Sequence, residues 1–229
     1  MAIENPRAGL AQGSFPRRLL LRSSLELSSL WPTRPAIAVM RKLHGVQLTT
    51  AQLSAVAAAV RKRARCKLLV FGLGNDSLFW LGLNQGGVTV FLEDNLEWFH
   101  RITKRSKKIT AFMVKYDTRL CDWRSLIESP ASLNMALPRQ VTDVSWDVVL
   151  VDAPEGWRAR SPGRMKSIYL TSRLVSEPAD VFVHDCNRVI EDAHCSKYLG
   201  EENLVAEIRA PVGYLRHYHI TTRSPPTSG

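Results

Sequence analysis

Residues 68–77 read LLVFGLGNDS, and residues 88–93 read VTVFLE. The first segment is an apolar run that leads into two glycines, and the second is an apolar run that ends in a carboxylate. A buried strand followed by a glycine turn, a helix and a second strand of this kind begins nucleotide-binding α/β folds. In such folds the turn lies beneath a cofactor and the acid binds the cofactor ribose, so the chain is a candidate enzyme.

The glycine turn also indicates which kind of cofactor to expect. Gly72 and Gly74 can adopt backbone angles denied to other residues and let a ligand approach the main chain. Ser77 replaces the third glycine of the dinucleotide motif, which disfavours a pyrophosphate on the following helix. S-adenosylmethionine has no phosphate and needs only this close approach and an acid for its ribose, and Glu93 lies 19 residues after Gly74. The alternative is an ordinary strand–turn–strand segment whose glycines only make the turn. The predicted cofactor-binding residues of this region are Gly72, Gly74, Asn75, Asp76, Ser77 and Glu93.

Length and composition are those of a globular protein with one domain and some extra length. The chain has 229 residues, of which 45% are hydrophobic and 23% charged. Its formal charge of +10 favours polyanionic partners such as nucleic acid, anionic membrane or acidic polysaccharide, without choosing among them. No apolar stretch reaches the roughly 18 residues of a transmembrane helix. The four cysteines contain no CxxC pair, which disfavours a structural zinc site and leaves disulfides and buried thiols open.

Short apolar strands alternate with helical segments along most of the chain. We expect core strands at 67–71, 88–92, 110–115, 146–151 and 180–183, helices at 49–63, 76–83, 95–103, 123–127, 164–174 and 188–198, and edge strands near 204–208 and 214–219. This alternation predicts a parallel sheet covered by helices on both faces. Residues 1–45 are expected to be a poorly ordered extension, 46–220 the domain, and 221–229 a disordered tail.

Polar residues follow the two core strands nearest the C-terminus. Asp152 comes after 146–151, and His184 and Asp185 come after 180–183. Ligands of parallel sheets bind beyond the carboxyl ends of the strands, so these side chains are candidate catalytic residues. Asp152 or Asp185 could act as a general base for a substrate hydroxyl, helped by His184. The two carboxylates, with Asn187, could instead hold a divalent metal that lowers the hydroxyl pKa. Simple capping of the following helices or turns is the structural alternative.

Two further segments contribute candidate binding residues. Asp117 follows the strand expected at 110–115 and is a candidate contact for the adenine side of the cofactor, although a simple polar loop explains it as well. Arg158 and Arg164 follow the Asp152 loop and would place positive charge at the mouth of the site. Such charge would attract and hold an anionic substrate such as a uronic acid. The alternative is ordinary surface charge.

Taken in order, these motifs resemble one family. The segments that carry the resemblance are FGLGNDSL at 71–78, TVFLE at 89–93, YDTRL at 116–120, VDAPEG at 151–156, PGRM at 162–165 and HDCNR at 184–188. They look like the plant glucuronoxylan 4-O-methyltransferase family, which includes the irregular-xylem polysaccharide-biosynthesis proteins, over roughly residues 46–219. The resemblance implies a Rossmann-like methyltransferase fold and S-adenosylmethionine-dependent methylation of glucuronic acid on cell-wall polysaccharide, either glucuronoxylan or arabinogalactan. It also implies a Golgi protein, and family members usually carry an N-terminal membrane anchor.

The chain departs from the family pattern in three places. Asn75 stands where catalytic members commonly have His, no membrane anchor is visible, and the segment after Gly213 follows the family ending only loosely. A non-catalytic polysaccharide-biosynthesis factor on the same fold therefore remains an alternative to the O-methyltransferase. A less favoured alternative is an RNA-binding methyltransferase. We expect no nucleic-acid partner, because aromatic and basic residues are not interleaved as in a base-stacking surface.

Overall fold

One seven-stranded sheet organises the protein. The computed structural model describes residues 33–222, so most of the predicted extension and most of the predicted tail lie outside the described residues. The strands are β1 (Lys67–Phe71), β2 (Val88–Glu93), β3 (Thr110–Met113), β4 (Trp146–Val151), β5 (Val175–Val183), β6 (Leu204–Ile208) and β7 (Leu215–Ile220). Their order across the sheet is β3-β2-β1-β4-β5-β7-β6. Strands β1 to β5 are parallel, and β7 runs antiparallel to both β5 and β6. The prediction of a mostly parallel sheet is confirmed.

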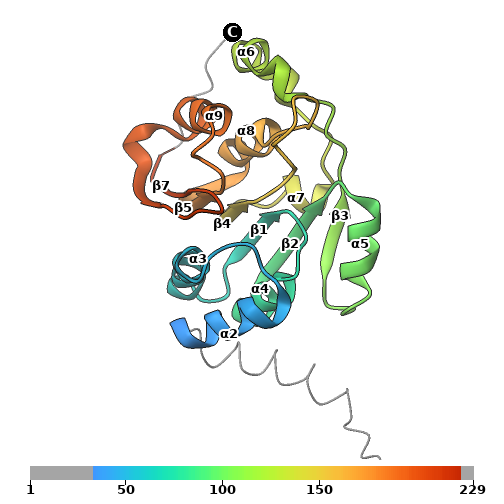
Figure 1. Ribbon diagram of the computed structural model, residues 1–229, viewed down its shortest axis with the longest axis vertical. Coiled ribbons are helices and arrows are strands. Elements are labelled where there is room, and N and C mark those ends of the chain that lie inside the picture. The colour runs from blue at the N-terminus through green and yellow to red at the C-terminus, as the bar shows by residue number, and fades with distance from the viewer. Residues whose placement is uncertain (1–32, 223–229) are drawn as a thin grey trace, which may run out of the picture.

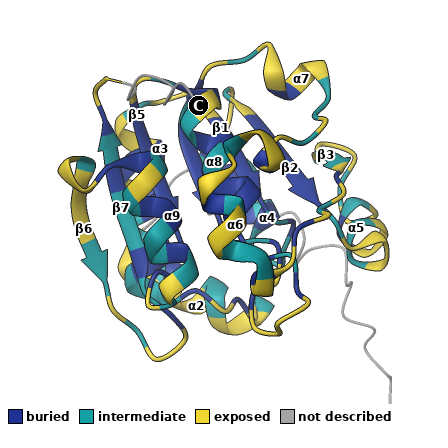
Figure 2. Cartoon of the chain, turned by 90° about the horizontal axis from the view of Figure 1, so that it is seen from above, coloured by how far each residue is buried: buried dark blue, intermediate teal, exposed yellow. Residues whose placement is uncertain are grey.

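Helices cover both faces of this sheet (Figure 1). One face carries α2 (Arg34–His44), α3 (Thr50–Lys62), α4 (Ser77–Leu83) and α5 (Leu96–Thr103), and the other carries α6 (Trp123–Glu128), α8 (Met165–Leu174) and α9 (Val189–Leu199). The short α7 (Arg139–Thr142) precedes β4, and three 3-10 helices occur at η1 (Leu120–Asp122), η2 (Pro130–Leu133) and η3 (Glu201–Asn203). The central strands are buried while the outer helix faces are exposed, as Figure 2 shows.

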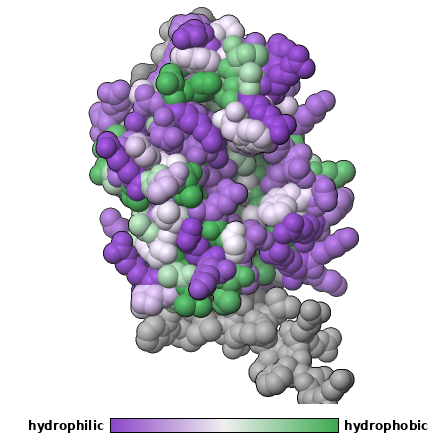
Figure 3. All heavy atoms as spheres, viewed as in Figure 1, coloured by the Kyte–Doolittle hydropathy of each residue, from purple (hydrophilic) through white to green (hydrophobic). Residues whose placement is uncertain are grey.

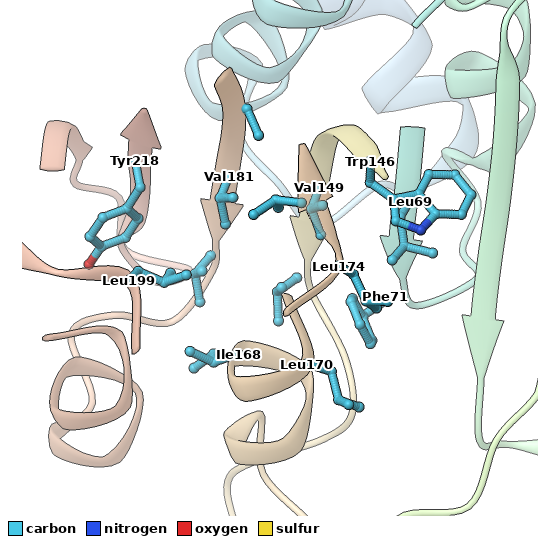
Figure 4. Close-up of a cluster of buried hydrophobic side chains, with 14 of the residues drawn as sticks. Leu69, Phe71, Trp146, Val149, Ile168, Leu170, Leu174, Val181, Leu199 and Tyr218 are labelled. Carbon is cyan, nitrogen blue, oxygen red and sulfur yellow. The ribbon is translucent and has the colours of Figure 1, made fainter. Parts of the chain in front are cut away.

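Alternate side chains of each central strand enter different cores. In β1, Leu69 and Phe71 pack into the core beneath α8 and α9, while Leu68 and Val70 pack into the core beneath α3 and α4. Figure 4 shows the first of these cores, where Ile168 of α8 lies under the strands. This arrangement follows from the two-residue period of a strand whose two faces are both covered. The continuous apolar runs read from the sequence are therefore strands buried on both sides.

Two elements differ from what the sequence predicted. Residues 34–44, assigned to the N-terminal extension, form α2, which buries Ile37 in the core beneath α3 and ends at Gly45 in the left-handed conformation (φ 62°). Strand β7 is not an edge strand, because it lies between β5 and β6 and pairs with both. Its apolar residues Leu215, Tyr218 and Ile220 are buried, which explains its inner position, and β6 forms the edge.

A buried carboxylate in β5 ties three elements together. Oδ2 of Asp180 accepts a hydrogen bond from Nε of Arg63 at 2.8 Å, at the end of α3. Its Oδ1 lies 2.9 Å from Nε2 of His217 and 2.9 Å from Nδ1 of His219, both in β7. Burial alone would raise the pKa of Asp180, but these hydrogen bonds and the Arg63 charge hold that pKa well below its usual range. Asp180 therefore links α3 to the middle of the sheet as an ionised group.

We expect Asp180→Ala to lower the free energy of unfolding by about 3 kcal/mol at pH 7, because it leaves Arg63 without its partner. Since the pKa of Asp180 is lowered in the folded state, this stabilisation is complete above the unfolded-state value of about 3.9 and is lost as pH falls through the folded value. Urea denaturation from pH 7 down to pH 2 measures the loss at neutral pH and the decline of the difference below the unfolded-state pKa. Asp143→Ala, at an exposed carboxylate, is the matched control and should change stability by less than about 0.5 kcal/mol. Equal losses in the two variants would contradict this assignment.

Candidate active site

The glycine turn after β1 is shaped by its neighbours. Gly72 has a φ of 116°, and a Cβ added there would lie 3.1 Å from Cβ of Ala153, in the loop after β4. A Cβ added at Gly74 would lie 2.7 Å from Oδ1 of Asp76. Ser77 accepts a hydrogen bond from the Gly74 amide at 2.9 Å through its Oγ. Gly72 is thus needed for the close approach of the β4 loop, whereas a side chain at Gly74 would have to displace only the end of the Asp76 side chain.

Glu93 joins the glycine turn to the end of β2. Its Oε2 accepts from the Leu73 amide at 2.9 Å, and its Oε1 accepts from the amides of Asp94 at 3.1 Å and Asn95 at 2.8 Å. Burial raises the pKa of Glu93, and these hydrogen bonds oppose the rise. A carboxylate offers about four acceptor positions, so one remains for a ligand hydroxyl. Glu93 is therefore fixed between the glycine turn and the end of β2, and its contact with a cofactor ribose stays a prediction.

Asp152 is the carboxylate that a substrate can reach. Its side chain is 31% exposed, and its Oδ1 lies 2.9 Å from Nδ1 of His184. Arg164 donates from Nη2 to the Asp152 carbonyl oxygen at 2.9 Å and lies 3.5 Å from Oδ1. Burial would raise the pKa of Asp152, but the His184 hydrogen bond and the charges of His184 and Arg164 lower it. The hydrogen bonds and ion pairs of its carboxylate to residues 33–222 all involve Oδ1, which leaves Oδ2 for chemistry.

Asp185 and Arg164 require a correction. Arg164 does not lie at the site mouth: it is buried, and its Nη1 lies 2.6 Å from Oδ2 of Asp185. Arg188 Nη2 lies 3.1 Å from the same Oδ2, and Nη1 of Arg164 is also 3.8 Å from Oε1 of the buried Glu191. Asp185 is thus neutralised by two guanidinium groups, which makes it a poor general base. We reassign Arg164 and Asp185 to holding Asp152 in place.

The two carboxylates predicted to hold a metal lie close together, but the charges around one of them disfavour a metal ion. Oδ1 of Asp152 and Oδ1 of Asp185 lie 2.9 and 3.7 Å from the same atom, Nδ1 of His184, so the two carboxylates converge as predicted. Arg164 and Arg188 already pair with Oδ2 of Asp185, so that oxygen is not free to bind a metal ion. Their positive charges would also repel a metal ion. Within residues 33–222, no group of three or more His, Cys, Asp or Glu side chains could hold a metal ion. The donor set therefore does not fit a divalent cation bridging Asp152 and Asp185.

His184 is covered by the loop between β6 and β7. A Cβ added at Gly213 would lie 2.9 Å from Nε2 of His184, which is buried and makes no hydrogen bond to the described residues. The Gly213 carbonyl accepts from Nε2 of Gln52 at 2.8 Å, and Gln52 also forms the capping box that begins α3. His184 therefore positions Asp152 and does not itself reach a substrate. Sequence reasoning missed Gln52, and no pattern around it predicts a contact with residue 213.

The remaining predicted binding residues lie on the surface. Asp117 follows β3 with a side chain that is 72% exposed, and Nζ of Lys166 lies 2.6 Å from its Oδ1. The hydrogen bond from Lys166 lowers the pKa of Asp117. Its predicted contact with an adenine ring stays a prediction. Arg158 is exposed in the loop after β4, where a substrate could reach it.

Negative charge gathers at the carboxyl ends of the strands. Burial and the charge of Asp152 raise the pKa of Asp76 to about 6, and burial and the charge of Glu155 raise the pKa of Asp94. The acids at this edge are Asp76, Glu93, Asp94, Asp152 and Glu155. Hydrophilic residues cover most of the face in Figure 3, and the chain as a whole carries +10. The site is thus acidic within a basic protein, which suits a small cationic ligand.

We expect Asp76→Asn to raise the free energy of unfolding by about 1 kcal/mol at pH 7.5. The folded-state pKa of about 6 lies above the ordinary value of 3.8, so stability falls as pH rises between these values and the ionised group is unfavourable at neutral pH. Asparagine keeps an oxygen for the hydrogen bond from Nε1 of Trp80, which is 2.8 Å long. Thermal unfolding at pH 7.5 and pH 4 tests this, since the gain should vanish at pH 4. A gain that persists at pH 4, or one matched by Asp143→Asn, would refute the charge explanation.

Comparisons with known proteins give the family. The model of the IRX15/IRX15L/GXM family matches residues 51–136 and 129–218. The chain belongs to this family. It is 36% identical over 200 residues to glucuronoxylan 4-O-methyltransferase 2 of Arabidopsis thaliana, covering 76% of this chain and 66% of that protein. It is 37% identical over 199 residues to arabinogalactan O-methyltransferase 1 of the same plant, covering 76% and 67%. The chain thus spans about two thirds of the length of these relatives.

The fold of this IRX15/IRX15L/GXM family member is also found in a solved methyltransferase structure. A putative caffeoyl-CoA O-methyltransferase from Staphylococcus aureus superposes with a TM-score of 0.54 at 11% identity, over 88% of this chain and 99% of that one. The predicted Rossmann-like methyltransferase fold is confirmed. None of the helices within residues 33–222 has the length and apolar character needed to cross a membrane.

Proposed function

We propose that the protein is an S-adenosylmethionine-dependent O-methyltransferase that acts on glucuronic acid residues of a cell-wall polysaccharide, either glucuronoxylan or arabinogalactan. The observation that carries this proposal is the reachable carboxylate of Asp152, which lies beside the glycine turn at the carboxyl ends of the strands. Its relatives support the proposal through their names, which describe methyltransferases of both polysaccharides. Family membership and the fold are consistent with it.

The residues of the site fit the cofactor. The turn at Gly72 permits close backbone approach, and Glu93 keeps one acceptor position for a ribose hydroxyl. The carboxylates of Asp76, Asp94 and Asp152 would attract its positive charge. When bound, S-adenosylmethionine supplies an electrophilic methyl group. A group of acids at the strand ends is a physical reason for a positively charged methyl donor to bind to a protein that is otherwise basic.

Asp152 would act as the general base. A sugar hydroxyl is a weak nucleophile while it holds its proton, and Oδ2 of Asp152 can accept that proton during transfer. His184 and Arg164 hold Oδ1 and the backbone of Asp152, so that Oδ2 keeps a fixed direction. The loop carrying Gly213 keeps water away from the far side of His184. Positioning of two reactants and removal of one proton are the main contributions of this chain.

A methyl-transfer assay tests the proposed function. Purified protein is incubated with S-adenosylmethionine labelled in the methyl group and with glucuronoxylan fragments, arabinogalactan, unsubstituted xylan or RNA. We expect label on a uronate-bearing glycan and none on unsubstituted xylan. Label on RNA alone would contradict the assignment. Binding of the cofactor or of the glycan with no transfer in any arm would favour a non-catalytic factor, which the Asn75 departure motivates.

A further inference from the structure

The loop between β4 and α8 is held by several hydrogen bonds although much of its surface is exposed. Oε1 of Glu155 accepts from the Ser161 hydroxyl at 2.9 Å, and the Glu155 carbonyl accepts from the Gly163 amide at 2.9 Å. The Gly156 carbonyl accepts from Nη1 of Arg188 at 2.8 Å, which is the arginine that also pairs with Asp185. The loop is therefore fastened to the same charged cluster that positions Asp152.

The loop after β3 also forms hydrogen bonds to the loop between β4 and α8. The Ser161 carbonyl accepts from the Leu120 amide at 2.9 Å, and the Pro162 carbonyl accepts from the Thr118 hydroxyl at 2.9 Å. The loop after β3 and the loop after β4 thus form one hydrogen-bonded wall at the carboxyl edge of the sheet. A side chain that projects from this wall is held in a fixed place with respect to the site.

Trp157 projects from this wall. It is 63% exposed, and its Nε1 donates to Oε2 of Glu155 at 3.2 Å, which orients the indole. The guanidinium of Arg158 lies 4.0 Å from the ring centroid. Arg158 has no carboxylate partner among residues 33–222, so its charge is free for a ligand. A large aromatic side chain that is fixed and left in water next to an unpaired arginine is a feature of binding surfaces.

The position of Trp157 in the chain limits its distance from the reacting group. It follows Asp152 by five residues, so the two Cα atoms are at most about 18 Å apart. The charge of Glu155, two residues before Trp157, reaches Asp94 at the end of β2 and raises its pKa. Gly156, directly before Trp157, is fastened to Arg188. A glycan of a few sugars bound at Trp157 could therefore extend to Asp152.

We propose that Trp157 and Arg158 form the platform that binds the acceptor, with a sugar ring on the indole and a uronate carboxylate on the guanidinium. This inference rests on the proposed function. A pyranose ring has one apolar face of C–H bonds, and the electron-rich face of an indole attracts it. Stacking uses the flat face of Arg158 and leaves its N–H edges free to form a bidentate pair with a carboxylate. The stacked guanidinium of Arg158 offers one oriented cation, which fits a single uronate better than the repeated phosphates of RNA.

Glycan binding measured without cofactor tests the platform separately from catalysis. The probe is a xylo-oligosaccharide bearing one glucuronic acid, titrated by calorimetry. We expect Trp157→Ala to weaken binding at least tenfold, and Trp157→Phe to restore most of the affinity. Arg158→Gln should weaken binding of this probe about tenfold but leave binding of its carboxyl-reduced counterpart unchanged. Arg160→Gln, at an exposed arginine of the same loop, is the matched control and should leave both affinities unchanged.

The outcomes separate the platform from the proposed function. Wild-type affinity in Trp157→Ala, no binding of the probe by the wild-type protein, or Trp157-dependent binding of RNA in its place would overturn the platform. Trp157-dependent binding of the probe together with no methyl transfer would leave the platform standing and overturn the methyltransferase. Trp157 is largely exposed, so thermal unfolding of Trp157→Ala should match the wild-type protein and exclude a folding defect.

Discussion

Asp152→Asn is expected to lower the turnover of methyl transfer by about 1,000-fold, because it removes the only proposed proton acceptor at the reacting hydroxyl. Asparagine keeps the shape of the side chain and can still contact His184, so the loop after β4 should remain in place. Affinity for S-adenosylmethionine should change by no more than about threefold, because the other strand-end acids remain. Turnover from a radiolabel assay and affinity from calorimetry check the two halves of this expectation.

His184→Gln separates positioning from proton transfer. The His184 hydrogen bond lowers the pKa of Asp152, so its loss should raise that pKa and move the acid limb of the pH–rate profile to higher pH. A purely structural role for His184 would reduce the rate without moving the profile. Asp143→Asn, at an exposed carboxylate to which no role in the site is assigned, should leave turnover unchanged. Normal methyl transfer by Asp152→Asn would refute its role as the base.

Arg164→Met is expected to lower the free energy of unfolding by about 4 kcal/mol or to prevent folding. The change removes the buried charge that faces Asp185 and Glu191 and leaves both with only the partly exposed Arg188 as a partner. An arginine at a substrate-binding surface would cost less than about 0.5 kcal/mol when replaced. Urea denaturation of the purified variant measures the difference.

A conservative variant keeps this expectation testable if Arg164→Met does not fold. Arg164→Lys retains the positive charge, but its single ammonium group cannot reach Asp185 and the Asp152 carbonyl at the same time. This variant should therefore fold with reduced stability. Arg160→Met is the matched surface control. A loss below about 1 kcal/mol for Arg164→Met would show that the buried ion pairs contribute little and would restore Arg164 as a candidate substrate contact.

The fold could be predicted because local patterns determine it. Apolar runs such as 146–151 are long enough for one strand and too short for a helix, and each is followed by a turn or cap. The convergence of Asp152 and Asp185 followed from the parallel direction of β4 and β5 alone. Helix α2 escaped prediction because proline and arginine near its start are also typical of an unfolded extension.

The role of each residue in the site could not be predicted, because that role depends on contacts with residues that are distant in sequence. Nothing in the segment around Asp185 shows that Arg164 would neutralise it. The contact between Gln52 and the Gly213 carbonyl joins residues 161 positions apart and decides that His184 is covered. Basic residues after Asp152 suggested a positive mouth, yet the structure divides them between a buried ion pair at Arg164 and an exposed pair at Trp157 and Arg158.

The central claim is that the acidic end of the sheet binds S-adenosylmethionine beside Asp152. Calorimetric titration at pH 7.5 tests it most directly, with Glu93→Gln as the matched variant. We predict one site per chain, binding at least about tenfold weaker in Glu93→Gln, and weaker wild-type binding below pH 6, where Asp76 takes up a proton. An absence of binding by the wild-type protein, or equal binding by Glu93→Gln, would contradict the claim.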